Sequence, residues 1–115
     1  MLVEDDADLR VVEQMALFAA GYRVITAAEG AAALRQLAAE RPALILLDMR
    51  MPGMNGWQFV KALRIEHGHD IPIVVVTAAE DARARAEEVG ADDHLAKPFE
   101  VDDLLRMVEK HVRPR

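Results

Sequence analysis

The sequence predicts an α/β fold in which a parallel five-stranded sheet is covered by helices on both faces. Five short apolar runs alternate with five segments of helical periodicity along the 115 residues. Because strand and helix follow each other through short connections, right-handed crossovers and a parallel sheet are expected. Alanine supplies 20 residues while aromatics are only 4%, which favours helices over wide β-sandwich faces. The even composition and this length indicate a single domain.

The apolar runs predict where the strands lie. Strands are predicted at Met1–Val3, Tyr22–Ala27, Ala43–Leu47, Ile71–Val76 and His94–Ala96. The third and fourth runs are continuous, as is typical of strands that are covered on both faces. Only three residues precede the first acidic residues, which is short for a central strand.

Helical periodicity places the helices between these strands. The first helix carries a stripe of the kind that faces a core, with a glycine, Gly21, at its end; the stripe consists of Leu9, Val12, Met15, Ala16 and Ala19. The other helices are predicted over Ala31–Glu40, Trp57–Glu66, Asp81–Val89 and Val101–Val112. Pro42 and Gly90 mark two of the helix ends.

Composition excludes several classes of function. The chain has no cysteine, so disulfide scaffolds, thiolate catalysis and cysteine metal sites are ruled out. No apolar run approaches the roughly 18 residues that span a bilayer. The sequence shows no leader, so we expect a cytoplasmic protein without a membrane partner. The net charge of −6 argues against direct nucleic-acid binding, which needs a basic face.

Acidic and polar residues follow the predicted strands, at the edge where such sheets bind ligands. Glu4 and Asp5 follow the first strand, and Asp48, Thr77 and Lys97 follow the third, fourth and fifth. If the first and third strands are neighbours, the three carboxylates converge and repel by about 3 kcal/mol per pair at about 5 Å. Hard oxygen ligands without histidine or cysteine suit Mg²⁺.

These residue types together indicate phosphoryl chemistry on a carboxylate. A metal ion and Lys97 would neutralise developing charge, Thr77 would supply a hydroxyl donor, and an aspartate would attack. Asp48 alone, after an apolar strand, would more often be a helix cap or turn residue, but its acidic partners and the following Met-Pro-Gly loop favour a functional role.

Four motifs follow one another along the chain: Val3–Asp6, Leu46–Gly56, Thr77–Ala78 and Gly90–Phe99. In their order and spacings they resemble the response-regulator receiver domain of two-component signalling, and the similarity covers essentially the whole chain. The resemblance implies a flavodoxin-like sheet with strand order 2-1-3-4-5 and five flanking helices. It also implies one receiver domain over residues 1–115, with no output domain in this chain.

The resemblance further implies roles for the acidic residues. Asp48 would accept a phosphoryl group from the phosphohistidine of a sensor histidine kinase or phosphotransfer protein. Glu4, Asp5, Asp48 and the backbone carbonyl of Arg50 would hold Mg²⁺. Asp6 falls one place beyond the acid pair and is left out of this set.

Three residues on later strands complete the implied switch. Lys97 would pair with the phosphoryl oxygens, and Thr77 would move to hydrogen-bond one of them. His94 stands where the family often has a tyrosine or phenylalanine that swings inward on activation, and the Lys97–Pro98 peptide would be cis. The output face would be the fourth helix, fifth strand and fifth helix, which would bind a downstream protein or domain, or form a homodimer.

Two other functions compete with this interpretation. A phosphohydrolase with an aspartyl nucleophile typically has a second aspartate two residues later, where this chain has Arg50. A degenerate receiver that binds partners without phosphate would not need all five site residues. A stand-alone receiver and one cut from a longer regulator remain equal alternatives.

Some other polar and aromatic residues have structural interpretations. Arg83 and Arg85 alternate with alanines and are predicted to form a solvated helix face. His111 is expected to interact with the dipole of the last helix, and Trp57 to pack at a helix start. The methionines beside Asp48 are expected to pack within their loop.

Overall fold

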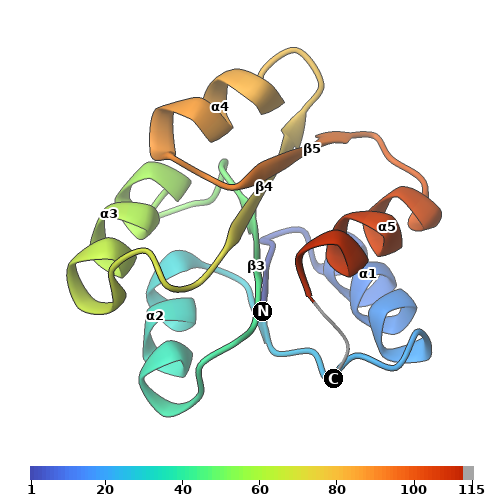
Figure 1. Cartoon of the computed structure of the whole chain (residues 1–115), viewed down its shortest axis with the longest axis horizontal. Coiled ribbons are helices and arrows are strands. Elements are labelled where there is room, and N and C mark those ends of the chain that lie inside the picture. Colours follow the sequence, from blue (N-terminus) through green and yellow to red (C-terminus); the bar gives the residue numbers. More distant parts are fainter. Residues whose placement is uncertain (113–115) are drawn as a thin grey trace.

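Five strands alternate with five helices in the computed structural model, which describes residues 1–112 (Figure 1). The strands are β1 (Leu2–Val3), β2 (Thr26–Ala27), β3 (Ile45–Asp48), β4 (Ile73–Ala78) and β5 (Asp93–Lys97). The helices are α1 (Ala7–Ala19), α2 (Gly30–Ala39), α3 (Gly56–His67), α4 (Ala82–Val89) and α5 (Val101–His111). Among these helices, none combines the length and the apolar character that a membrane crossing requires. The last three residues of the domain expected over 1–115 lie outside the described residues.

All strand pairs are parallel, and the sheet order is β2-β1-β3-β4-β5, so the predicted fold class and strand order are confirmed. Val3 lies beside Leu47 in the ladder between β1 and β3. The residues that follow, Glu4 and Asp48, therefore reach the same edge of the sheet. This register brings the first acidic residues to Asp48.

Strand boundaries differ from the sequence prediction at the carboxyl end of the sheet. β3 continues to Asp48, β4 continues past Thr77, and β5 ends at Lys97. Parallel neighbours extend these strands, since Asp48 pairs with Val76 and Thr77 pairs with Ala96. β2 is shorter than predicted because its neighbour β1 offers only two residues to pair with.

Helices α2, α3 and α4 cover one face of the sheet, and α1 and α5 cover the other (Figure 1). β4 contributes to both cores, because Ile73 and Val75 point to one face while Val74 and Val76 point to the other. This confirms that the continuous apolar runs are strands buried on both sides.

Helix α1 turns a different face to the sheet than its apolar stripe suggests. Glu13 and Leu17 are its buried residues, whereas Leu9, Val12 and Met15 are exposed, Met15 at 66%. Two constraints set the rotation of the helix: the short connection from β1, and Asp6, which caps it by accepting hydrogen bonds from two backbone amides of the first turn. The expectation of a core-facing stripe is therefore wrong for this helix.

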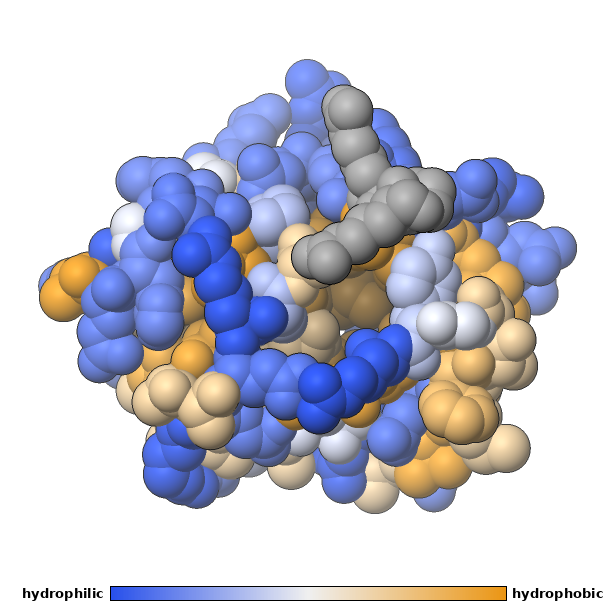
Figure 2. Space-filling model, turned by 60° about the horizontal axis from the view of Figure 1, so that its bottom comes forward, coloured by the Kyte–Doolittle hydropathy of each residue, from blue (hydrophilic) through white to orange (hydrophobic). Residues whose placement is uncertain are grey.

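A hollow lies at the amino-terminal end of the strands, opposite the acidic residues. Figure 2 shows its apolar floor and hydrophilic rim. The cavity measures about 290 Å³ and its lining includes Tyr22, Val24 and Leu44. No group of metal-binding side chains occurs there among the described residues.

Candidate functional site

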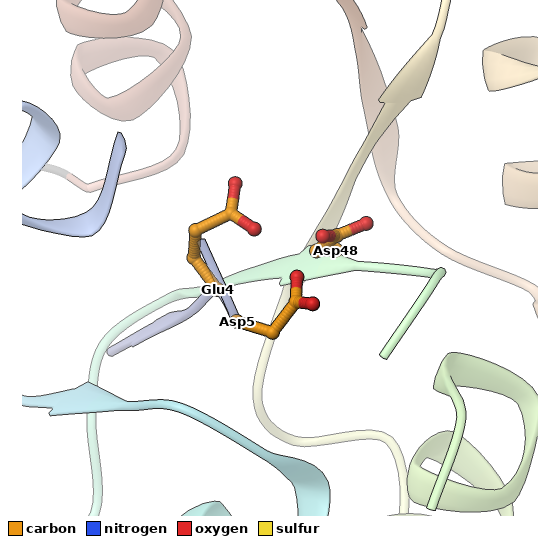
Figure 3. A group of neighbouring side chains, drawn as sticks. All are labelled: Glu4, Asp5 and Asp48. Atoms are coloured by element: carbon orange, nitrogen blue, oxygen red, sulfur yellow. The ribbon is translucent and has the colours of Figure 1, made fainter. Parts of the chain in front are cut away.

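Three carboxylates converge at the carboxyl ends of β1 and β3 (Figure 3). Glu4 and Asp5 follow β1, and Asp48 is the last residue of β3. One oxygen from each lies within 4.8 Å of the other two. Glu4 and Asp48 are buried, Asp48 at 7% exposure, while Asp5 is open to solvent. The sheet register thus brings together the acidic residues singled out from the sequence.

Lys97 is the cation that faces these carboxylates. Its ammonium nitrogen lies 2.7 Å from Oε1 of Glu4 and 3.6 Å from Oδ2 of Asp48. The side chain comes from the end of β5, and the following peptide bond to Pro98 is cis, as the resemblance implied. A single ammonium therefore pairs with two buried carboxylates.

The remaining polar contact to Asp48 comes from its own loop. The backbone amide of Arg50 donates to Oδ1 of Asp48 at 3.0 Å. The guanidinium of Arg50 points elsewhere and pairs with Asp81, just before α4, at 3.1 Å. The structure therefore brings the backbone of Arg50, and not its side chain, to the acid.

The loop between β3 and α3 is held tightly against the sheet. Met49 and Met51 are buried, which confirms the predicted packing role of these methionines. A Cβ at Gly56 would lie 2.7 Å from the Cα of Met49, so this close approach requires glycine. Asn55 begins α3 with a capping box that includes Gln58. The backbone on both sides of Arg50 is therefore held in place by packing and by the start of α3.

The electrostatics of the cluster show a deficit of positive charge. The pKa of Asp48 is raised to about 7: burial and then hydrogen bonding with Glu4 raise it, while the Arg50 amide and Lys97 act in the opposite direction. Burial also acts to raise the pKa of Glu4, but its contacts with Asp48 and Lys97 outweigh burial and lower it. Without a further cation, Glu4 holds the charge and Asp48 tends to hold a proton.

A cavity of about 580 Å³ opens beside Asp48. Thr77 and Lys97 line it together with apolar residues of α1 and of the segment that leads into α5, including Leu9 and Phe99. Thr77 is buried in β4, one residue beyond Val76, the register partner of Asp48. The cavity gives an incoming group access to the carboxylate.

His94 lies outside this cavity lining. It is half-buried in the edge strand β5, where its register partner is Val75 of β4. It is separated from Lys97 by two residues of the same strand. The structure therefore places His94 beside the site and not in it.

Sequence reasoning missed Glu13, a fourth acid at this end of the sheet. It comes from α1, is 4% exposed and lines the same cavity as Asp48 and Lys97. Burial raises its pKa to about 7, with a smaller contribution from the charge of Glu4. The available signal was its spacing of four residues from Leu17, which puts an acid on the face that Leu17 buries.

Asp93 forms a second cluster of charged residues, which the sequence also did not reveal. Its Oδ2 lies 2.7 Å from the ammonium of Lys110 and 2.9 Å from Nε2 of His111. Burial acts to raise the pKa of Asp93, but these two partners and the His94 amide outweigh it and lower the pKa to about 2. His111 therefore pairs with a specific acid, in addition to its place in the last turn of α5.

Arg85 does not belong to a solvated helix face, so that prediction is wrong. Its guanidinium carbon lies 5.7 Å from the ring centre of Trp57, and it pairs with Glu88 at 2.7 Å. The indole nitrogen of Trp57 donates to Glu88 at 2.9 Å. Arg83 is exposed and pairs along the helix with Glu87, as a solvated face would. Trp57 and Arg85 thus connect α3 to α4.

Solved structures of other proteins have a similar fold. A chemotaxis protein CheY4 of Vibrio cholerae is 34% identical, with a TM-score of 0.86 over 96% of this chain and 95% of that one. The receiver domain of the sensor histidine kinase PA1611 from Pseudomonas aeruginosa PAO1 is also 34% identical, with a TM-score of 0.86 over 96% and 93%. That structure has a magnesium ion coordinated in its active site cleft.

Curated relatives and a family model give the same result. The transcriptional regulatory protein PrrA of Mycobacterium tuberculosis is 38% identical over all of this chain and 50% of its own length. The regulator NtrC of Escherichia coli K12 is 37% identical over 96% of this chain and 24% of its own length. This chain therefore spans half or less of these relatives. The family model "Response regulator receiver domain" matches residues 1–109, and the chain belongs to the response regulator receiver domain family.

Proposed function

We propose that this receiver domain is a phosphorylation-dependent switch in which Asp48 accepts a phosphoryl group. The donor would be the phosphohistidine of a sensor histidine kinase or of a phosphotransfer protein. One observation carries the proposal: Glu4, Asp5 and Asp48 bring oxygens within 4.8 Å of one another beside a single ammonium, that of Lys97. Such crowding is costly unless a cation and a charged ligand belong to the site.

Mg²⁺ fits the residues that are present. The donors are carboxylate oxygens without histidine or cysteine. Burial and the neighbouring Glu4 raise the pKa of Asp48, so a bound cation would favour its charged form. Glu4, Asp5, Asp48 and the backbone carbonyl of Arg50 would hold the ion. The magnesium ion in the similar Pseudomonas aeruginosa receiver supports this assignment. When bound, the ion supplies charge neutralisation at the phosphoryl oxygens.

Each site residue would have a separate role in the phosphoryl transfer. An oxygen of Asp48 forms the bond to phosphorus while the P–N bond of the donor breaks, and its electron pair stays on the imidazole nitrogen. Lys97 would turn from the acids to the phosphoryl oxygens, and the Thr77 hydroxyl would donate to one of them. The Arg50 amide already fixes one Asp48 oxygen at 3.0 Å and so orients the carboxylate.

Output would pass from the site to the face formed by α4, β5 and α5. Thr77 and Lys97 lie on the neighbouring strands β4 and β5, and His94 lies on β5 as well. Phosphorylation would shift an equilibrium between two arrangements of this face. A downstream protein or domain, or a second copy of the chain, would then bind it.

Phosphorylation by a small donor tests the proposal. The protein is incubated with Mg²⁺ and acetyl phosphate or phosphoramidate, and its intact mass is measured. We expect one phosphoryl group per chain, absent in Asp48→Asn and present in Asp93→Asn, the matched change at the other acid cluster. An adduct that persists in Asp48→Asn, or no adduct with either donor, would contradict the proposal. Steady release of phosphate from many monoesters would instead favour a phosphohydrolase.

A further inference from the structure

Glu13 is a buried acid whose Oε2 atom lacks a hydrogen-bond partner. It lies on the face of α1 that packs on the sheet, one turn before Leu17. The side chain lines the cavity of about 580 Å³ that also holds Asp48 and Lys97. Glu13 also lines a small space together with Glu4 and Asp48, so its unpartnered oxygen belongs to a side chain that borders the proposed phosphorylation site.

An apolar residue would suit this position better if only stability mattered. The space between Glu13 and the sheet is lined by apolar side chains, Leu46, Val76 and Leu104 among them, and by the acids Glu4 and Asp48. A buried carboxyl without a partner costs free energy that an apolar side chain of similar volume does not. Since buried unsatisfied groups are rare, we expect Glu13 to gain a partner in another arrangement of the site.

Lys97 is the cation closest in role, because its charge and that of Glu13 act on each other's pKa. Among the described residues, the cavity lining holds two cationic side chains, Lys97 and Arg50, and Arg50 is paired with Asp81. The ammonium of Lys97 has three N–H donors, and its carboxylate contacts are Glu4 at 2.7 Å and Asp48 at 3.6 Å. Both of these acids are the ones assigned to Mg²⁺. When they turn to a cation, the ammonium needs another acceptor in the same cavity.

We propose that Glu13 is a positioning residue that accepts the Lys97 ammonium when Glu4 and Asp48 bind the metal ion. The inference rests on the proposed function for the presence of that ion. Glu13 keeps the ammonium inside the cavity, close to where the phosphoryl oxygens arrive. Without Glu13, Lys97 stays on Glu4 and opposes the entry of the cation.

Carbon-13 labelling of the lysine ε-carbons tests this directly, because the chain contains only three lysines, Lys61, Lys97 and Lys110. Lys61→Arg and Lys110→Arg assign the signals. On titration with Mg²⁺, we expect the Lys97 signal to shift in the unaltered protein, and the shift to be lost in Glu13→Gln and Glu13→Leu. The same titrations give the affinity for Mg²⁺, which should fall about tenfold in both variants. Asp8→Asn removes an exposed acid of the same helix and should change neither quantity.

A purely structural role for Glu13 makes a different prediction. Glu13→Leu removes a buried charge, so we expect it to fold and to melt at a higher temperature than the unaltered protein. A higher melting temperature with an unchanged Lys97 shift would overturn the inference. So would a Lys97 signal that ignores Mg²⁺ in the unaltered protein. If Asp48 is nevertheless phosphorylated in either case, the proposed function stands and only the role of Glu13 fails.

Discussion

Asp48 and Asp93 are two acids of the same sheet whose pKa values are shifted in opposite directions. Each belongs to a strand, Asp48 at the end of β3 and Asp93 at the start of β5. Both side chains are largely buried, at 8% and 16% exposure. Yet the pKa of Asp48 is raised to about 7, while that of Asp93 is lowered to about 2. Burial acts in the same direction on both, so the neighbours decide the outcome.

The neighbours of the two acids differ in charge. Asp93 meets Lys110, His111 and a backbone amide, all of which donate to it. Asp48 meets a second carboxylate, one amide and an ammonium that lies closer to Glu4. The cluster around Asp93 is complete and stabilises the fold. The cluster around Asp48 lacks positive charge, and that deficit is what a cation-dependent phosphoryl site requires.

Removing the lysine of each cluster should give the largest difference between the two clusters in the rate of phosphorylation. Lys97→Met should slow phosphorylation of Asp48 by small donors by about 100-fold or more, since a cation aimed at developing charge is lost. Lys110→Met removes the lysine from Asp93 and should leave that rate unchanged. The rate of adduct formation, measured by intact mass, checks both. Equal effects of the two substitutions would show that the clusters do not differ in function.

The two acids should also govern stability in different pH ranges. The folded-state pKa of Asp48 is raised above its ordinary value, so the folded protein binds this proton more tightly. Stability is therefore lost as pH rises from about 4 through about 7, by on the order of a few kcal/mol. Urea unfolding at several pH values measures this loss. Glu13, whose pKa is also raised to about 7, contributes to the same slope. Asp48→Asn should therefore reduce the slope without abolishing it, and an unchanged slope would show that Asp48 does not contribute.

Asp93 should act in the opposite direction and at lower pH. Its folded-state pKa is lowered, so its stabilisation is present above about pH 4 and is lost as pH falls through about 2. Asp93→Asn should lower the free energy of unfolding at neutral pH by about 1 to 3 kcal/mol, because Lys110 and His111 lose their partner. Urea unfolding at neutral pH checks this. A stability equal to that of the unaltered protein would mean that the contacts of Asp93 contribute nothing.

The sequence predicted most of the fold because its signals are local. Continuous apolar runs marked β3 and β4, and the acids after them pointed to the site edge. The boundaries at Asp48, Thr77 and Lys97 were missed because pairing with neighbouring strands extends the ladder. The prediction of the buried face of α1 failed for a similar reason. The Asp6 cap and a short connection, and not hydropathy alone, fix the rotation of the helix.

Contacts between residues distant in sequence were beyond prediction. Glu13 reaches the cavity through the fold of α1 on the sheet, and Asp93 meets Lys110 because α5 returns along β5. Arg85 looked solvated because alternating arginines and alanines carry no sign of the Trp57 ring on α3. Such pairs depend on the packing of whole elements, which short patterns do not encode.

The smallest effect is expected at Arg85, which pairs with Glu88 and lies over the Trp57 ring. Arg85→Ala removes its contacts with Trp57 and Glu88 and should lower the free energy of unfolding by about 0.5 to 1 kcal/mol. Phosphorylation of Asp48 should stay unchanged, as for substitutions in the Asp93 cluster. Urea unfolding followed by the fluorescence of Trp57, the only tryptophan, measures the loss. A slower phosphorylation rate would show that the link between α3 and α4 influences the site.

Titration of the aspartate carboxyl carbons by nuclear magnetic resonance, with and without Mg²⁺, tests the central claim most directly. Without Mg²⁺, Asp48 should titrate near its pKa of about 7 and Asp93 near its pKa of about 2. With Mg²⁺, the pKa of Asp48 should fall far below 7 while that of Asp93 stays in place, since only the cluster of Asp48 needs a cation. An Asp48 signal that titrates in the ordinary aspartate range and ignores Mg²⁺ would contradict the account.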